Sequence, residues 1–300
     1  MAAISEIRAR NADFWTQAAE GWIRQADRHD RLGRPLGAAA VDALNLEPGE
    51  RVLDVGCGCG GTTAELAAMV TPGGLATGLD LSVSMVAAAA QRFPHLVFTT
   101  ADIETARSIA GSPFDAVFSR MTLMLLTDPV AGCDTVRRLL RPGGRLAATV
   151  FRDGATSPWL SAAVLGAAPH VGALPPLPVG GEPGPFAFAD RAHVMRVLTD
   201  AGFIDINVEP RDVELCAPDE PDTVAGWLID IGPAGAAYRA APATQQDAAR
   251  AGVARLLRRY HQPDTGYRLP TGLWLITAST SRDRQGQSAL APPADGPVVM

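Results

Sequence analysis

The stretch Arg51-Val-Leu-Asp-Val-Gly-Cys-Gly-Cys-Gly-Gly61, followed by Gly78-Leu-Asp80, decides the fold of this chain. Val52, Leu53 and Val55 form the apolar run expected of a strand that is buried on both faces of a parallel sheet. The glycines let the backbone turn sharply and approach a ligand, because no Cβ is in the way. The next helix directs free N–H groups and its positive dipole end toward that ligand. Asp80 ends the second strand, where a carboxylate can accept hydrogen bonds from both ribose hydroxyls. The pattern predicts a site for an adenosine-containing cofactor.

Two classes of cofactor fit this glycine pattern. The spacing Gly56-x-Gly58-x-x-Gly61 satisfies the dinucleotide fingerprint, and Asp80 lies about the right distance downstream. Asp54, at the end of the first strand, would repel a pyrophosphate but suits the methionine ammonium group of S-adenosylmethionine, directly or through water. Asp54 therefore favours S-adenosylmethionine, and an NAD(P)-dependent oxidoreductase is the alternative.

From about residue 40 to residue 280 the chain resembles the class I S-adenosylmethionine-dependent methyltransferases. Phe98-Thr-Thr-Ala-Asp102 is similar to their third strand, Phe114-Asp-Ala-Val-Phe-Ser-Arg120 to their fourth, and Leu139-Leu-Arg-Pro-Gly-Gly-Arg-Leu146 to the turn before their fifth. The run from Phe114 to Pro129 and the segment Gly184-Pro-Phe-Ala-Phe-Ala-Asp190 are similar to bacterial small-molecule methyltransferases related to the ubiquinone/menaquinone C-methyltransferases.

The resemblance implies that the chain transfers a methyl group by direct displacement to an oxygen, nitrogen or carbon of a small, largely apolar metabolite in bacterial secondary metabolism. It leaves open a relative that keeps the cofactor but catalyses another reaction, such as a pericyclic or decarboxylative step. It also leaves open a non-catalytic subunit that only binds the cofactor, although the intact glycine loop argues against this.

Composition restricts the partners and the location of the protein. The chain has 300 residues, 47% of them hydrophobic, which suits one large domain or a domain with a cap. The net charge is −6 and no run is rich in Lys or Arg, which argues against a nucleic-acid partner. The start lacks the hydrophobic core of a signal peptide, and no apolar run is long enough to span a membrane. A cytoplasmic protein without a membrane partner or a bound metal is expected, and the sequence leaves a homodimer open.

Strands that alternate with helices predict an α/β fold with a parallel sheet and right-handed crossovers. The expected architecture is a Rossmann-like, seven-stranded, mostly parallel sheet, whose last strand is antiparallel, with helices on both faces and an α-helical cap. Five parts are expected: an N-terminal helical lid at residues 1–34, the cofactor-binding core at 35–151, a cap insertion at 152–189, the rest of the core at 190–280 with a helical cap insertion at about 218–262, and a disordered tail at 281–300. In related methyltransferases such an N-terminal segment folds over the cofactor; alternatively, Trp15 and Trp22 only pack on the helices of the sheet.

The resemblance also assigns the cofactor contacts. The glycine loop would line the methionine moiety, Asp80 would hold the ribose, and residues after the second and third strands would enclose the adenine. For Arg120 the sequence leaves two roles open, a contact with the cofactor or a surface ion pair. The expected cofactor residues are Asp54, Gly56, Cys57, Gly58, Gly60, Asp80, Leu81, Met85, Ala101, Asp102, Ile103, Ser119 and Arg120.

Methyl transfer from a sulfonium needs alignment of three atoms and exclusion of water, but no general acid. A general base is needed only when the nucleophile carries a proton of high pKa. His170 and His261 are the candidate bases, and the enzyme can also work without one. Aromatic residues in the cap segments either line the acceptor pocket, which would favour a small apolar or aromatic acceptor, or form the core of the cap. They are Trp159, Phe186, Phe188, Trp227 and Tyr238.

Overall fold

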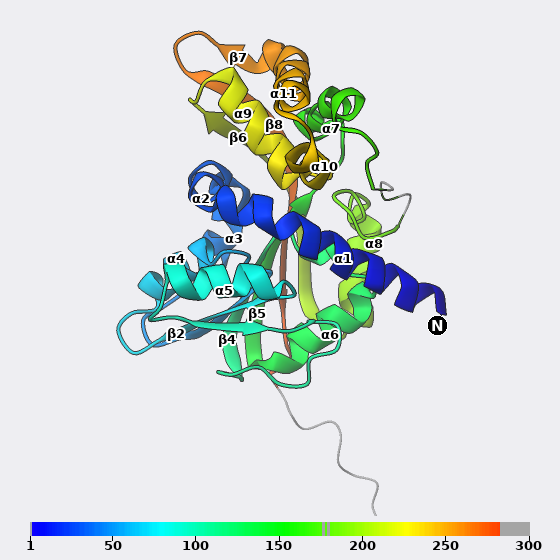
Figure 1. Cartoon of the computed structure of the whole chain (residues 1–300). Helices are drawn as coiled ribbons and strands as arrows, with labels where there is room; N and C mark the ends of the chain where they lie inside the picture. Colours follow the sequence, from blue (N-terminus) through cyan, green and yellow to red (C-terminus); the bar gives the residue numbers. More distant parts are fainter. Residues whose placement is uncertain (1, 176–177, 179–180, 283–300) are drawn as a thin grey trace, which may run out of the picture.

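The computed structural model describes residues 2–175, 178 and 181–282 of the chain (Figure 1). Apart from its first two residues, the tail for which disorder was predicted, 281–300, lies outside the described residues. No helix among the described residues is long and apolar enough to cross a membrane.

A mixed sheet with the strand order β3-β2-β1-β4-β5-β8-β6 forms the centre of the molecule. The strands from β1 to β5 are parallel to their neighbours, and β8 runs antiparallel between β5 and β6. The predicted Rossmann-like fold with an antiparallel last strand is confirmed. The prediction missed an additional two-residue strand, β7, which pairs with β8. The strands are β1 Arg51–Val55, β2 Leu75–Asp80, β3 Val97–Thr100, β4 Phe114–Arg120, β5 Leu140–Phe151, β6 Ile204–Ala217, β7 His261–Gln262 and β8 Gly266–Ser279.

Helices cover both faces of the sheet, and further helices lie beyond its upper edge in Figure 1. The α-helices are α1 Ala2–Arg24, α2 Ala26–Gly33, α3 Pro35–Leu44, α4 Gly61–Met69, α5 Val83–Arg92, α6 Pro129–Leu139, α7 Pro158–Val171, α8 Arg191–Asp200, α9 Pro221–Ile231, α10 Gly235–Ala240 and α11 Ala243–Leu257; the 3₁₀ turns are η1 Leu123–Leu125 and η2 Arg258–Tyr260.

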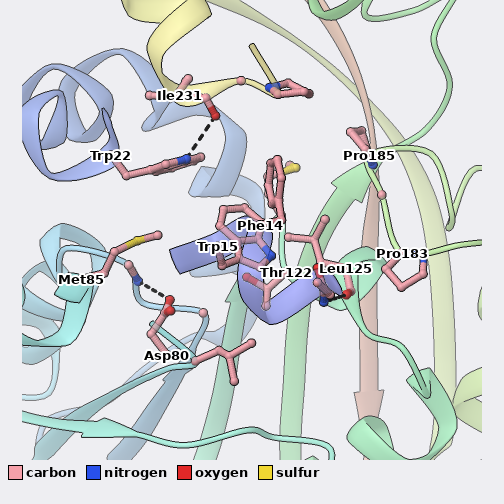
Figure 2. A pocket seen from close by; sticks show the side chains of 18 of the residues that line it. Phe14, Trp15, Trp22, Asp80, Met85, Thr122, Leu125, Pro183, Pro185 and Ile231 are labelled. Atoms are coloured by element: carbon pink, nitrogen blue, oxygen red, sulfur yellow. Dashed lines mark hydrogen bonds between the residues drawn. The ribbon is translucent and has the colours of Figure 1, made fainter. Parts of the chain in front are cut away.

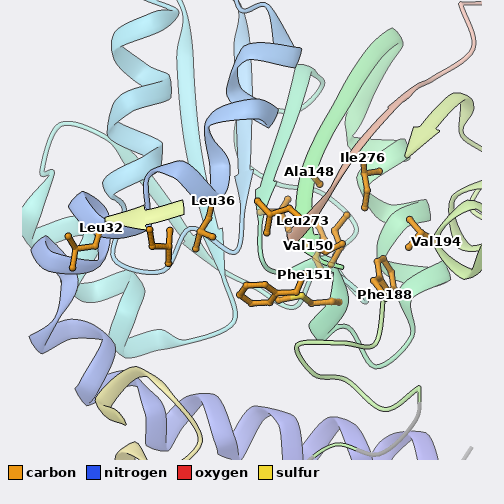
Figure 3. Close-up of a cluster of buried hydrophobic side chains, with 14 of the residues drawn as sticks. Leu32, Leu36, Ala148, Val150, Phe151, Phe188, Val194, Leu273 and Ile276 are labelled. Atoms are coloured by element: carbon orange, nitrogen blue, oxygen red, sulfur yellow. The ribbon is translucent and has the colours of Figure 1, made fainter. Parts of the chain in front are cut away.

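Alternation along the strands assigns side chains to two hydrophobic layers, since successive residues of a strand point to opposite faces. Val52 of β1 packs in the cluster that contains residues of α3 and α4, whereas Leu53 packs in the cluster that contains residues of α6 and α8. The second cluster continues across β5 and β8 to Phe188 and Val194 (Figure 3). Both faces of the central strands are therefore buried, as their apolar sequences require.

Local signals start several of these helices. Asp128 precedes α6 and its carboxylate accepts a hydrogen bond from the backbone N–H of Ala131, while Pro129 occupies the first helical position. Asp190 caps α8 in the same way through the N–H groups of Ala192 and His193. These caps fix the residues at which α6 and α8 begin.

The cap consists of α7, α9, α10 and α11, which pack against one another. α7 and α11 approach closely, because Gly166 has no side chain: a Cβ there would lie 2.6 Å from the Cα of Val253. α7 lies within 152–189, a segment in which the sequence indicated a cap but no helix. Its Pro169 falls in the last turn, where the missing N–H removes one helical hydrogen bond, and the helix ends soon afterwards, before Gly172.

Candidate functional site

A cavity of about 820 Å³ opens at the carboxyl ends of the parallel strands. The glycine loop after β1 and the ends of β2 and β4 form its floor, and α1 and α2 cross over it. Cap residues from α7 and α9 close the remaining side, and Figure 2 shows Ile231 at the end of α9. Open α/β sheets bind ligands at this edge, so the cavity lies where the sequence pattern predicts a ligand.

The glycine loop leaves the sheet through residues that a side chain would obstruct. Gly56 has φ +79°, and a Cβ on it would lie 1.9 Å from the hydroxyl oxygen of Thr122. Gly56, Cys57 and Gly58 line the cavity. Gly60 does not, because it faces inward, where a Cβ would lie 2.8 Å from the ring of Phe98. The loop therefore offers backbone to a ligand and uses Gly60 for packing.

Asp80 joins the glycine loop to the start of α5. Its Oδ2 accepts a hydrogen bond of 2.9 Å from the N–H of Gly58, and its Oδ1 accepts one of 2.8 Å from the N–H of Ser82 (Figure 2 shows the first). Burial raises the pKa of Asp80, and these backbone N–H groups oppose the rise. Each carboxylate oxygen has two lone pairs, so both can accept another hydrogen bond from the cavity.

Asp54 lies behind the loop and does not line the cavity. Its side chain is 2% exposed and its Oδ2 accepts a hydrogen bond of 2.7 Å from the hydroxyl of Thr63 on α4. Burial raises the pKa of Asp54 to about 6, and the Thr63 hydrogen bond and the positive charge of Arg120 oppose the rise.

An apolar slot with one polar edge lies beside Asp80. Leu81 and Met85 line it from the start of α5, and Ala101, Asp102 and Ile103 line it from the loop after β3. Asp102 accepts a hydrogen bond of 2.8 Å from the N–H of Glu104, which turns one carboxylate oxygen toward the loop backbone. The arrangement suits a flat heterocycle with an amino group at its edge.

The two residues at the end of β4 that the sequence predicts as cofactor contacts, Ser119 and Arg120, lie in different surroundings. Ser119 is buried and its hydroxyl donates a hydrogen bond to the carbonyl of Val55, so it joins β4 to β1 and does not line the cavity. Arg120 lines the cavity. Among the described residues it forms no ion pair, and its guanidinium donates only a long hydrogen bond of 3.4 Å to the carbonyl of Gly33. A ligand anion would complete this site.

The N-terminal helix contributes aromatic side chains to the cavity. Phe14, Trp15 and Trp22 line it, and the indole N–H of Trp22 donates a hydrogen bond of 3.1 Å to the carbonyl of Ile231 at the end of α9 (Figure 2). α1 is also joined to the side of the cavity next to the loop after β3, because the Arg8 guanidinium lies 2.7 Å from a Glu104 carboxylate oxygen. α1 thus spans from the sheet to the cap above the cavity.

His29 on α2 is a cavity residue that the sequence reasoning missed. Its ring lies 4.6 Å from the ring of Trp22 and 6.4 Å from that of Trp227, and its Nδ1 is buried without a hydrogen-bond partner among the described residues. Burial, followed by the charge of Arg120, lowers the pKa of His29 to about 3, so the imidazole is neutral at pH 7. Trp15, Trp22 and His29 are each seven residues apart, which is about two helical turns. This spacing was the signal in the sequence that the three side chains lie on one face.

The cap side of the cavity is apolar. Trp159, Leu160 and Ala163 of α7 face Leu228 and Ile229 of α9 across it. The indole N–H of Trp159 is satisfied away from the cavity, since it donates a hydrogen bond of 3.0 Å to the hydroxyl of Thr271. Only the aromatic face of Trp159 is therefore available to a ligand.

Four other predicted pocket aromatics do not line this cavity. Phe186 packs against the ring of Phe151, and Phe188 is 2% exposed within the main hydrophobic cluster. Trp227 is likewise buried, and the Tyr238 hydroxyl accepts a hydrogen bond of 2.7 Å from Arg250. The structure places these four side chains elsewhere: Phe186 and Phe188 pack in the main hydrophobic cluster, and Trp227 and Tyr238 are buried in the cap, where burial of a large apolar surface is favourable.

The two histidines proposed as bases also lie elsewhere, because neither lines the cavity. His170 sits at the end of α7 beside Gly252 of α11. His261 belongs to the short strand β7, and its ring packs 4.9 Å from that of Tyr267. Both lie in the cap, but packing against α11 and β8 keeps them away from the cavity, so His29 replaces them as the histidine near a ligand.

Comparison with known proteins gives concordant matches. A family model described as a methyltransferase domain matches residues 52–144. The nocamycin O-methyltransferase of Saccharothrix syringae is 32% identical over 225 residues, which are 70% of this chain and 80% of that relative. The demethylmenaquinone methyltransferase of Beutenbergia cavernae is 40% identical over 130 residues, which are 43% of this chain and 50% of that relative. The crystal structure of the YcgJ protein from Bacillus subtilis, with 13% identity and a TM-score of 0.51, covers 85% of this chain and 99% of that one, and shares its fold.

Proposed function

Since the chain belongs to the family of S-adenosylmethionine-dependent methyltransferases, we propose that the cavity at the carboxyl ends of its strands binds the cofactor at the glycine loop and a small apolar acceptor under the cap. One observation carries this proposal. The same cavity has a nucleoside-sized end with a carboxylate, Asp80, and an apolar end under α7 and α9.

The residues present fit the cofactor. Gly56 and Gly58 form a backbone cradle that a Cβ at Gly56 would fill, and Asp80 keeps free lone pairs for a ribose. Arg120, which has no anionic partner among the described residues, would hold the carboxylate of the methionine moiety, and Asp54 would balance its ammonium group through water. An enclosed guanidinium without an anion is unfavourable, so a carboxylate there stabilises both groups.

When bound, S-adenosylmethionine supplies a methyl group on a good leaving group. The chain itself holds the two reactants in place and excludes water. α1 covers the cavity, and apolar side chains such as Trp159 of α7 and Leu228 of α9 keep water from the acceptor. Proximity and orientation of this kind can contribute on the order of 7–11 kcal/mol to a displacement. With His170 and His261 outside the cavity, no residue is assigned as a general base, and the acceptor is an oxygen, nitrogen or carbon nucleophile that reacts without one or loses its proton to water.

The relatives support the acceptor class. One is by its name an O-methyltransferase of nocamycin and another a methyltransferase of demethylmenaquinone. An acceptor of this kind, small and largely apolar, would match the apolar half of the cavity, and bacterial secondary metabolism is the proposed setting.

Calorimetric titration tests the cofactor, with S-adenosylhomocysteine as the ligand and NADH as the control. Micromolar affinity for the first and none for the second is the expected result, and the reverse would overturn the proposal.

Arg120→Met tests the carboxylate contact. It should weaken binding of S-adenosylhomocysteine but leave binding of 5′-methylthioadenosine, which lacks the amino-acid moiety, unchanged. Equal losses for both ligands would place Arg120 elsewhere. Transfer of radiolabel from S-adenosylmethionine to a panel of apolar hydroxylated, amino and enolic compounds then identifies the acceptor.

A further inference from the structure

A second hollow lies on the outer side of the cap, between α7 and the junction of α11 with η2. It encloses about 700 Å³ and is separate from the cofactor cavity. α7 and α11 lie next to each other in Figure 1. The two hollows share α7, because Trp159 and Ala163 face the cofactor cavity whereas Leu165 faces the outer groove. The groove therefore backs onto the wall of the acceptor site.

The groove exposes large apolar side chains from both helices. Leu165 of α7 is 66% exposed and Leu256 of α11 is 41% exposed, and both line it. A single exposed leucine is ordinary on a protein surface. Two leucines on adjacent helices, lining one concavity, instead form a small apolar strip of the size that a partner's side chains cover.

Arginines surround this strip and no acidic residue lines it. Among the described residues Arg255, Arg258 and Arg259 form no ion pair with a carboxylate. On the same helix Arg250 differs, because it pairs with both Asp222 and Asp247. The guanidinium of Arg259 is held over the ring of Tyr260, 4.7 Å from its centre. This cationic cluster stands on a chain whose net charge is −6.

We propose that this groove is a docking surface for an acidic amphipathic helix of a partner protein. Charge complementarity gives the sign of the partner's charge, since its carboxylates would contact the three arginines of the groove. The apolar strip between two helical ridges receives a row of leucine-sized side chains, as in other helix-in-groove complexes. A concave surface suits a helix better than a flat bilayer, and the net negative charge of the chain disfavours nucleic acid. The small groove makes the complex transient.

Fluorescence anisotropy with the full-length protein tests the proposal. The probe is a labelled helical peptide of Glu, Ala and Leu with leucines at positions i, i+4, i+7 and i+11. Its control has Lys at every Glu position. The acidic peptide should bind saturably and the lysine peptide should not. The double variant Arg255→Glu/Arg258→Glu and the single variant Leu165→Ser should each weaken binding at least tenfold. The matched double variant Arg107→Glu/Arg282→Glu, with the same change of charge at exposed sites outside the groove, should keep it within twofold.

Unchanged affinity of S-adenosylhomocysteine in each variant shows that the protein remains folded. The proposal is overturned if neither peptide binds, if both double variants weaken binding equally, or if vesicles of phosphatidylglycerol bind through the groove while the acidic peptide does not. These outcomes do not depend on whether the chain methylates a small acceptor.

Discussion

Asp80 accepts hydrogen bonds from the glycine loop and from the residue that caps α5, so one carboxylate both shapes the nucleoside end of the cavity and faces it. Asp80→Ala should remove charge-assisted hydrogen bonds worth roughly 1.5–3 kcal/mol. The expected result is an approximately 10- to 100-fold weaker affinity for S-adenosylhomocysteine by calorimetry. Asp42→Ala, at an exposed position near the end of α3, is the control and should bind like the wild type. Equal affinity in both variants would remove Asp80 from the site.

His29 makes stability depend on pH. Its pKa is about 3 in the folded chain, below the ordinary value of 6.5 that applies when the chain is unfolded. The contribution of neutral His29 to the free energy of unfolding is therefore fully present above pH 6.5. It is lost as the pH drops from 6.5 toward 3, because only the unfolded chain takes up the proton. The slope is about 1.4 kcal/mol per pH unit, or roughly 2 kcal/mol between pH 6.5 and pH 5.

The variant His29→Gln removes this proton uptake. Its free energy of unfolding in urea should therefore fall by roughly 2 kcal/mol less than that of the wild type between pH 7 and pH 5. His95→Gln, at an exposed position, should retain the pH dependence of the wild type. If His29→Gln and the wild type follow the same pH profile, the imidazole is not held neutral by burial.

At the scale of elements, a buried carboxylate holds the lid to the cap. Asp230 near the end of α9 is 3% exposed. Its carboxylate lies 2.9 Å from Arg239 of α10 and 3.1 Å from Arg24 of α1. It also accepts a hydrogen bond of 3.2 Å from the side chain of Gln25. The Asp230 carboxylate therefore joins α9 to α10 and to α1 at one buried point.

Asp230→Ala should lower the free energy of unfolding by about 3–5 kcal/mol, because the nearly buried Arg239 guanidinium loses its buried partner and keeps only the exposed Glu20 as a counter-ion. The same substitution at Asp222, on the same helix but exposed in its pair with Arg250, should cost less than about 1 kcal/mol. Urea unfolding of the two variants makes the comparison. Similar losses at both positions would contradict the role given to burial.

For the whole molecule, the cavity lies between three parts that are distant in the sequence: the sheet edge, the α7–α11 cap and α1. α1 is joined to the sheet side through Arg8 and through Asn11, whose amide donates a hydrogen bond of 2.9 Å to the carbonyl of Leu125. It is joined to the cap through Trp22. Ligand binding should thus stabilise all three parts together.

S-adenosylhomocysteine at about one hundred times its dissociation constant should add about 2.7 kcal/mol to the free energy of unfolding. The expected rise in Tm is about 4 °C, because unfolding a chain of this length has an entropy of roughly 0.6 kcal/mol/K. Hydrogen exchange in α1 should slow in the same samples, since the helix covers the occupied cavity. The measurements are calorimetry and exchange mass spectrometry, with NADH at equal concentration as the control. Stabilisation without slower exchange in α1 would mean that α1 is not part of the closed site.

Prediction from the sequence was most accurate where the signal is local. The run from Arg51 to Asp80 specifies a strand, a glycine turn, a helix and a second strand within about thirty residues, and the structure has β1, α4 and β2 there. Boundaries were less accurate where tertiary pairing extends an element. β5 begins at Leu140 rather than Arg145, because Leu140 pairs with Phe114 before the register shifts at the glycine turn.

The sequence by itself determined the sheet, the class of cofactor and the place of the glycine loop, because apolar runs, glycine spacing and strand-end acids act through neighbouring residues. Only the tertiary structure decided which side chains meet in the cavity. Trp159 lines it, whereas Phe188, Trp227 and Tyr238 are buried in the hydrophobic core. His29 lines it, and His170 and His261 do not. These outcomes depend on how α2, α7 and α9 rotate against one another, and packing between distant segments sets that rotation.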